Sequence, residues 1–217
     1  MLPSEIPLFP LPNVVLFPGA FLPLHVFEPR YRAMLTDALA GDRLVGLVLL
    51  RPGWGLEYEE RAPVYPIGCA GLISHVDRLE DGHYNIIVHG LEKFRIVGEA
   101  TGTGTSSVHP YRVARIEPIF EALVAGDRTA IRDERRRLEA LLVPRRAGTE
   151  RNGPLPPGIS DEDLVNALAQ HLALDPIEKQ ALLERDGVLA RCQSLIELLE
   201  MKELAGRVPA STRARTH

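Results

Sequence analysis

The sequence predicts an α+β fold in which a strand-rich first half is followed by a helical second half. Up to about residue 118, short apolar runs are broken by Pro and Gly, a pattern typical of strands. After Pro118 the apolar period changes from two residues to about 3.6, the period of a helix. We therefore expect a β-rich subdomain over residues 1–118, a helical bundle over 119–206 and a flexible tail over 207–217.

Composition places the chain among ordinary globular proteins. Its 217 residues are 45% hydrophobic and 25% charged, which excludes extended disorder, collagen and coiled-coil arrays. The net charge of −4 and the pI near 6.0 disfavour a general nucleic-acid binder or a binder of anionic membranes. Two cysteines, Cys69 and Cys192, are too few for a disulfide framework or a four-cysteine zinc site, and they suit a reducing cytoplasm.

An apolar stretch near the N-terminus is long enough to span a membrane but contains too many prolines for a membrane-spanning helix. No Asp, Glu, Lys or Arg occurs over the 22 residues between Glu5 and Glu28, but five of these residues are prolines. Because proline removes helical hydrogen bonds, we expect buried extended structure there. No basic segment precedes the stretch, so we expect no export signal and a cytoplasmic protein.

The first half is predicted to contain one helix among its strands. The helix begins at Glu28-Pro29, where proline suits a first helical position, and ends at Gly41. Asp81-Gly82 is typical of a hairpin turn, and 51–66 is expected to be a long loop. The strands are expected at 6–10, 21–27, 44–50, 67–79, 83–98 and 108–117.

Helical periodicity and capping signals organise the second half. Ser160 with Asp163, and Asp175 with Glu178, have the spacing of a capping box at a helix start. Between the first helix and Ser160, residues 144–159 are expected to be a linker. The first helix and the last helix are marked by apolar stripes, at Ile131, Leu138, Leu141 and Leu142 and at Leu189, Cys192, Ile196 and Leu199 respectively.

Recognisable catalytic motifs are absent from the sequence. It contains no phosphate-binding G-x-x-x-x-G-K-[ST] loop and no G-x-S-x-G nucleophile elbow. A metal site of His75, His83 and His89 is conceivable on neighbouring strands, but no metal-binding spacing supports it. Glu28 and Arg30 are favoured as a local pair at a helix start, with ligand binding as the alternative. We expect no catalytic residue, no metal and no cofactor.

Several motifs in order resemble the N-terminal domain of Lon proteases over about residues 5–205. The first is the run IPLFPLPNVVLFPG at 6–19, followed by LPLHVFEPRYR at 22–32. Two more, IGCAG at 67–71 and GHYNIIVHGLEKFRI at 82–96, match later strands of that domain. Near the end, LDPIEKQALLE at 174–184, with Arg191 before a leucine-rich helix, resembles the end of the domain.

The resemblance implies a fold and a role. The fold is a PUA-like mixed β-sheet or pseudo-barrel followed by a helical bundle. The role is recognition of substrate polypeptides, without the ATPase and peptidase that act on them in Lon. By this resemblance we expect a free-standing, ATP-independent and non-enzymatic binding module linked to proteolysis or quality control. Its partners would be unfolded or partner polypeptides and a separate protease or chaperone. Arginine-rich, lysine-poor usage indicates a bacterial source.

Three functions remain open, each with its own residues. Polypeptide binding is favoured, with Trp54, Leu56 and Tyr58 as candidate contacts because aromatic side chains on a Gly/Pro-flanked loop are hard to bury. The structural alternative is that Trp54 covers the core. The second function is RNA binding through a basic cluster interleaved with acids: Arg132, Arg135, Arg136, Arg137, Arg145 and Arg146. The third function is binding of a small ligand in a cleft between the β part and the helices.

Overall fold

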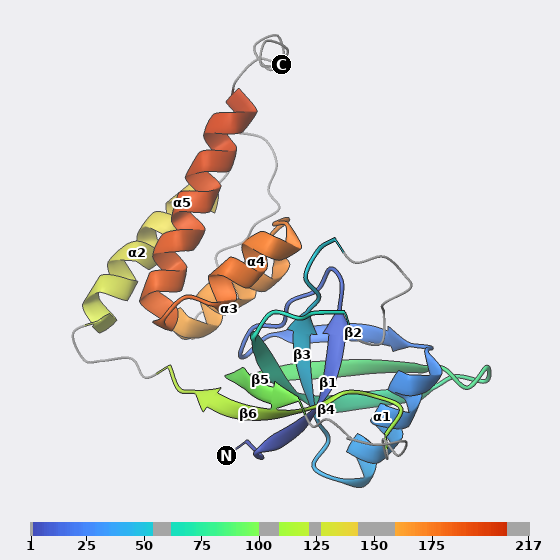
Figure 1. Cartoon of the computed structure of the whole chain (residues 1–217). Helices are drawn as coiled ribbons and strands as arrows, with labels where there is room; N and C mark the ends of the chain where they lie inside the picture. The colour runs from blue at the N-terminus through green and yellow to red at the C-terminus, as the bar shows by residue number, and fades with distance from the viewer. Residues whose placement is uncertain (1, 54–61, 100–108, 122–126, 143–158, 208–217) are drawn as a thin grey trace. The chain divides into compact units, whose positions relative to one another are not determined.

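A computed structural model describes residues 2–53, 62–99, 109–121, 127–142 and 159–207 of the chain (Figure 1). By their contacts the residues group into two compact units, which we describe separately. Unit 1 comprises Met1–Phe120 and Asn166–Glu184, and unit 2 comprises Glu121–Val165 and Arg185–His217. The division into subdomains at residue 118 that the sequence suggests stays a prediction.

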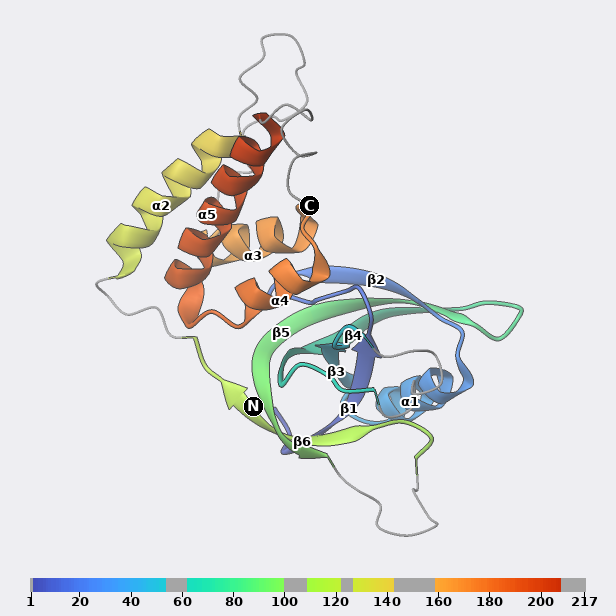
Figure 2. The same cartoon turned by 45° about the horizontal axis from the view of Figure 1, so that its top comes forward.

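Unit 1 is built on a six-stranded mixed sheet among the described residues. Its spatial order is β2-β5-β4-β3-β1-β6, and an additional pairing of β5 with β6 closes the sheet into a barrel (Figure 2). β1 and β3 are parallel, and the other pairs are antiparallel. The strands are β1 (Glu5–Leu11), β2 (Phe21–Val26), β3 (Leu44–Leu49), β4 (Ile67–Arg78), β5 (Tyr84–Glu99) and β6 (Val113–Ile119).

Glycines allow close packing inside the barrel. Phe94 of β5 is fully buried, and an added Cβ on either Gly46 or Gly68 would lie 2.9 Å from its ring. At Gly90 an added Cβ would lie 2.1 Å from the Phe17 carbonyl oxygen, because the chain before β2 crosses β5 there. The core around Phe94 consists of the buried side chains of Ile6, Leu8, Val48, Ala70, Ala114 and Ile116.

Two buried glutamines attach helical segments to the barrel of unit 1. The helix α3 (Asp161–His171) belongs to unit 1 from Asn166 onward, and there the Gln170 side-chain oxygen accepts a hydrogen bond from the Phe17 N–H at 3.0 Å. The helix α4 (Pro176–Leu183) is held by Gln180, whose amide donates to the Ile67 carbonyl at 2.9 Å. A polar side chain is costly to bury unless it is bonded, so these bonds fix both segments on the barrel.

Unit 2 has a helical core that contains a buried ion pair. It includes α2 (Asp127–Leu142), the start of α3 and α5 (Gly187–Arg207). Arg191 of α5 is 0% exposed, and its guanidinium donates to both Glu121 carboxylate oxygens at 2.6 and 2.8 Å. Burial is the main cause that raises the pKa of Glu162, and the Glu121 charge adds to it.

The fold class and all six strands predicted from the sequence are confirmed, and only the last strand differs by more than one residue at an end. The last strand begins at Val113, not at 108, and continues to Ile119. Among residues 109–112, Pro110 has no N–H for a ladder, and Tyr111 instead donates a hydrogen bond to Asp37 of α1 (Pro29–Ala40) at 2.7 Å. The described ends of the predicted 51–66 loop lie together, because the Arg51 N–H donates to the Pro63 carbonyl at 2.8 Å and Leu50 forms a bridge with Val64.

The predicted helices are also found, and their stripes are largely buried. Ile131, Leu138, Cys192 and Ile196 are buried, whereas Leu189 and Leu199 are half-buried. The predicted tail beyond 207 and nearly all of the 144–159 linker lie outside the described residues. Within the described ranges, no helix combines the length and the apolar character that crossing a bilayer requires.

Replacing Gly90 by alanine is expected to destabilise the protein by about 2–4 kcal/mol, because the new methyl group meets backbone, which cannot rotate away. Chemical denaturation of the purified variant measures this change. Gly41→Ala is the matched control, since the nearest atom to its added Cβ is 3.7 Å away. Equal stability of the two variants would contradict the packing described here.

The two cysteines are expected to be unreactive in the folded protein. Both are fully buried, and burial raises the pKa of the Cys192 thiol to about 11. At pH 8, a thiol of this pKa is a thiolate in only about one molecule in a thousand. A thiol-reactive dye should label neither cysteine in native buffer and both in guanidinium chloride. Fast labelling of native protein would show that a cysteine is accessible.

Candidate functional site

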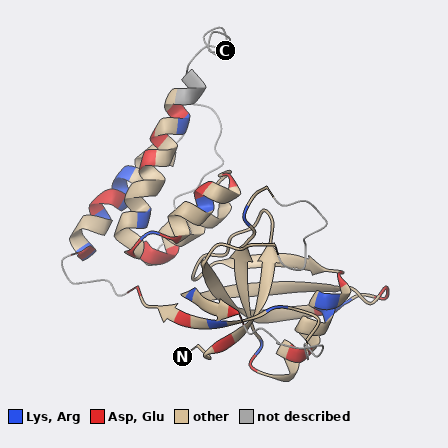
Figure 3. Cartoon of the chain, viewed as in Figure 1, with Lys and Arg blue, Asp and Glu red and all other residues tan. Residues whose placement is uncertain are grey.

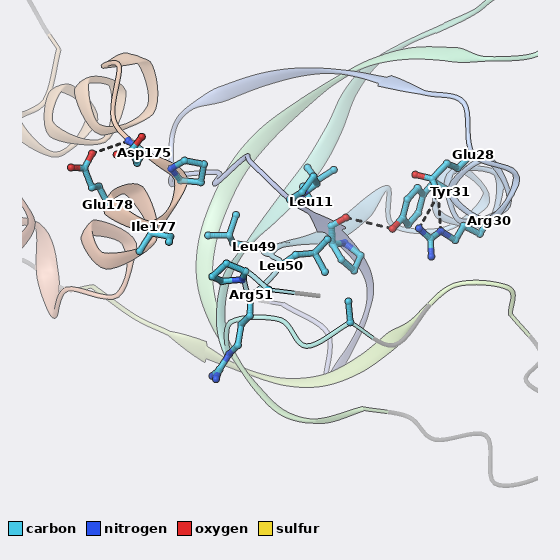
Figure 4. A pocket seen from close by; sticks show the side chains of 16 residues that line it. Leu11, Glu28, Arg30, Tyr31, Leu49, Leu50, Arg51, Asp175, Ile177 and Glu178 are labelled. Atoms are coloured by element: carbon cyan, nitrogen blue, oxygen red, sulfur yellow. Dashed lines mark hydrogen bonds and ion pairs between the residues drawn. The ribbon is translucent and has the colours of Figure 1, made fainter. Parts of the chain in front are cut away.

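An apolar groove lies where β1 and β3 end. Because these strands are parallel, their carboxyl ends meet at the same mouth of the barrel. Leu11 ends β1, Leu49 ends β3, and both line the groove together with Leu50 (Figure 4). The groove has a volume of about 840 Å³ and is lined mainly by apolar surface. Its size is that of sites that enclose several side chains of a ligand.

The start of α1 forms one end of the groove. Glu28 and Arg30 pair there, with Arg30 Nε donating to Glu28 Oε2 at 2.9 Å. The Arg30 guanidinium also lies 4.6 Å from the centre of the Tyr31 ring, and the Tyr31 hydroxyl donates to the Pro10 carbonyl at 3.4 Å. The local pair expected for Glu28 and Arg30 is therefore present. The Glu28 side chain makes no cap hydrogen bond to the helix backbone.

The start of α4 forms the other end (Figure 4). The predicted capping box is confirmed, and in it Glu178 Oε2 accepts from the Asp175 N–H at 2.7 Å. The box fixes the first turn of α4 and leaves the Ile177 side chain 52% exposed beside the groove. The groove thus has two ends whose charged groups are locally bonded, and an apolar middle.

The groove is adjacent in sequence to the predicted binding loop. Arg51, Pro52, Gly53 and Ala62 line it, and they flank the segment that carries Trp54, Leu56 and Tyr58. Those three residues lie outside the described part of the chain, so their role in binding stays a prediction. Arg51 is itself oriented by its Nε, which donates to the Val64 carbonyl at 3.3 Å.

The predicted basic cluster is placed among acids wherever the structure describes it. Arg135 contacts Glu139 and Asp161 at 2.8 Å, and these bonds raise its pKa. Arg136 pairs with Asp133, and Arg137 pairs with Glu200. Basic and acidic positions are mixed along α2 (Figure 3). Arg132 is exposed, whereas Arg145 and Arg146 lie outside the described residues. RNA binding by this cluster stays a prediction, and no feature of the described arginines favours it.

Two of the three histidines weighed as a metal site, His83 and His89, make other contacts. His83 Nδ1 lies 3.0 Å from Asp81 Oδ2, and the His89 ring stacks on Phe21 at 4.5 Å. Among the described residues, no group of three or more His, Cys, Asp or Glu side chains is placed to hold a metal ion.

The sequence interpretation did not single out the apolar residues of the groove. Leu11, Leu50 and Ile177 look like ordinary strand or helix positions, and Asp175 and Glu178 were predicted only as caps. The groove exists because β1 and β3 pair in parallel, which brings their two ends together. Local periodicity does not specify which strands pair, so the sequence held no signal for this site.

Residues 5–201 match the family model of the ATP-dependent protease La (Lon) substrate-binding domain. The chain belongs to this family. Lon protease 2 of Syntrophobacter fumaroxidans is 30% identical over 95% of the chain and 26% of its own length. Lon protease 2 of Myxococcus xanthus is 28% identical over 93% of the chain and 24% of its own length. The chain therefore spans about a quarter of the length of these Lon relatives.

Solved structures of Lon N-terminal domains share the fold. The N-terminal domain of Mycobacterium avium complex Lon protease matches with a TM-score of 0.60 and 20% identity, over 90% of this chain and 98% of that one. A Lon N-terminal domain protein from Xanthomonas campestris matches with a TM-score of 0.56 and 21% identity, over 95% of this chain and 99% of that one. The family is the substrate-binding domain of Lon, separate from its peptidase.

Replacing Glu178 by alanine is expected to destabilise the protein by about 1 kcal/mol, because the Asp175 N–H loses its acceptor. Thermal unfolding measures the change. Glu178→Gln keeps an acceptor oxygen and serves as the control. If Gln and Ala lower the melting temperature equally, the cap bond does not stabilise the start of α4.

Proposed function

We propose that the protein is a non-catalytic module of the cytoplasm that binds exposed apolar segments of polypeptides, linked to proteolysis or quality control. The observation that carries the proposal is the apolar groove at the mouth of the barrel in a chain of the Lon substrate-binding family. Unfolded chains expose apolar side chains that folded proteins bury. A groove with an apolar middle therefore favours them over folded surfaces.

The chemistry of the groove supports transient binding. Burying one Leu or Phe side chain is worth roughly 1.5–3 kcal/mol, and a groove of about 840 Å³ takes only a short run of such side chains. Ordering a flexible client opposes part of this gain. We therefore expect dissociation constants of about 10 µM or weaker, with selectivity for apolar content and not for one sequence.

The charged groups at the two ends of the groove determine how binding should depend on salt. Glu28 is paired with Arg30, and Glu178 is bonded to the Asp175 N–H, so the groove presents few charges free to bind a client. Binding driven by apolar burial should change little between low and high salt. Phosphate-driven RNA binding would instead weaken steeply with salt.

Replacing Ile177 by aspartate is expected to weaken binding of an unfolded polypeptide about tenfold, because it puts a charge beside the apolar middle of the groove. Fluorescence anisotropy of labelled, reduced and carboxymethylated α-lactalbumin measures affinity at two salt concentrations without ATP. Trp54→Ala, measured in parallel, tests the predicted loop.

The matched control is Phe120→Asp, another exposed apolar residue of unit 1 that does not line the groove. It should bind like the unchanged protein. If the unfolded chain does not bind at all, or if labelled RNA binds in its place and high salt abolishes that binding, the proposed function is wrong. If both aspartate variants bind normally, the groove is not the site.

A further inference from the structure

β2 is an edge strand of the barrel, with backbone groups that face away from its neighbour. Among the described strands it pairs only with β5. The Gly90 N–H donates to the Ala20 carbonyl at 2.8 Å, and the Gly90 carbonyl accepts from the Gly19 N–H at 2.8 Å, so Gly90 directs its backbone groups toward β2. Bonded and non-bonded pairs alternate along an antiparallel ladder, so in the register of β2 with β5 Leu22, Leu24 and Val26 also bond to β5. Phe21, Pro23 and His25 therefore direct their backbone groups outward.

The position of Pro23 agrees with this alternation. Proline has no N–H, so it fits a strand only where the ladder does not need a donor. The outward edge of β2 consequently offers three carbonyl acceptors, at Phe21, Pro23 and His25, and two N–H donors, at Phe21 and His25. A strand laid along this edge would make up to five backbone hydrogen bonds.

The outer face of the same strand carries exposed aromatic side chains. Phe21 is 54% exposed and Phe27, just beyond the strand, is 55% exposed. Each is held by an imidazole ring: Phe21 stacks on His89 at 4.5 Å, and Phe27 lies 6.0 Å from His25. These contacts orient the two phenyl rings along one face of β2, where they can contact alternate side chains of an added strand.

The edge also lacks the charged side chains that protect many edge strands, although it contains Pro23, and its end is joined in sequence to the groove. No Asp, Glu, Lys or Arg occurs in β2, and lysine is the residue that most often discourages pairing at such edges (Figure 3). β2 leads through Phe27 directly into Glu28, which lines one end of the groove. The outer edge of β2 is thus joined in sequence to one end of the groove.

We propose that β2 binds an extended apolar segment of a client polypeptide as an added strand of the sheet. The inference rests on the proposed function and specifies how the client is held. Backbone hydrogen bonds supply affinity without regard to sequence, and Phe21 and Phe27 supply a preference for apolar side chains at alternate positions. An edge of this kind favours unfolded chains over folded proteins, because most backbone groups of a folded protein are already paired.

The test compares two fluorescein-labelled decapeptides of alternating Val and Thr. In the second, every backbone nitrogen of the central six residues is methylated. Methylation makes the peptide more apolar but removes its donors, so we expect its affinity to fall at least about tenfold. Equal affinities would show that side chains alone hold the client, and strand addition would be wrong while the proposed function stood. If neither peptide binds and unfolded α-lactalbumin also does not bind, both proposals fail.

Hydrogen exchange locates the added strand on the protein. The Phe21 and His25 amides should exchange more slowly when the unmethylated peptide is bound, whereas the Leu22 and Leu24 amides, already bonded to β5, should change little. Unchanged exchange at Phe21 and His25 in a peptide-bound sample would overturn the proposal. Phe21→Ala should weaken peptide binding, and Val97→Ala, at an exposed residue near the far end of β5, is its control.

Discussion

The barrel of unit 1 depends on β5, which pairs with three other strands. Its first half pairs with β2, its second half pairs with β6, and β4 accompanies it along both. Gly90 lies between the two halves opposite Gly71, and a Cβ on Gly71 would lie 2.2 Å from a Val88 methyl carbon. The absence of side chains at this pair allows the chain before β2 to cross β5. Without that crossing, β2 would not lie on β5 and would not lead into α1 at the groove.

The order of the strands in the barrel also explains why the middle of the groove is apolar. The parallel pairing of β1 and β3 exposes two apolar strand ends at one mouth of the barrel. Helix starts lie at the two ends of that mouth, and their charged side chains are occupied locally by the Glu28–Arg30 pair and the α4 capping box. An apolar surface remains between them. This combination is the physical basis of the selectivity for exposed apolar chain segments that we propose.

The sequence predicted the elements well because their signals are local. Proline and glycine delimit the strands, Glu28-Pro29 opens α1, and Asp175 with Glu178 opens α4. The groove could not be predicted in this way, because Leu11, Leu50 and Ile177 come from three distant segments. Buried polar anchors such as Gln180 were missed for the same reason, since the Ile67 carbonyl that Gln180 binds lies 113 residues away. The family and its role came from resemblance, not from periodicity.

The discontinuity of the two units has a consequence for synthesis on the ribosome. Unit 1 needs Gln170 and Gln180 as well as its barrel, so its last part emerges only after α2 and the start of α3 have been made. The pairing of β1 with β6 likewise joins residues separated by more than a hundred positions. Contacts of such high sequence separation slow folding. During translation the nascent chain therefore carries its own unpaired apolar strands for longer than a protein with contiguous domains, and it has the greatest need of chaperones before residue 184 leaves the exit tunnel.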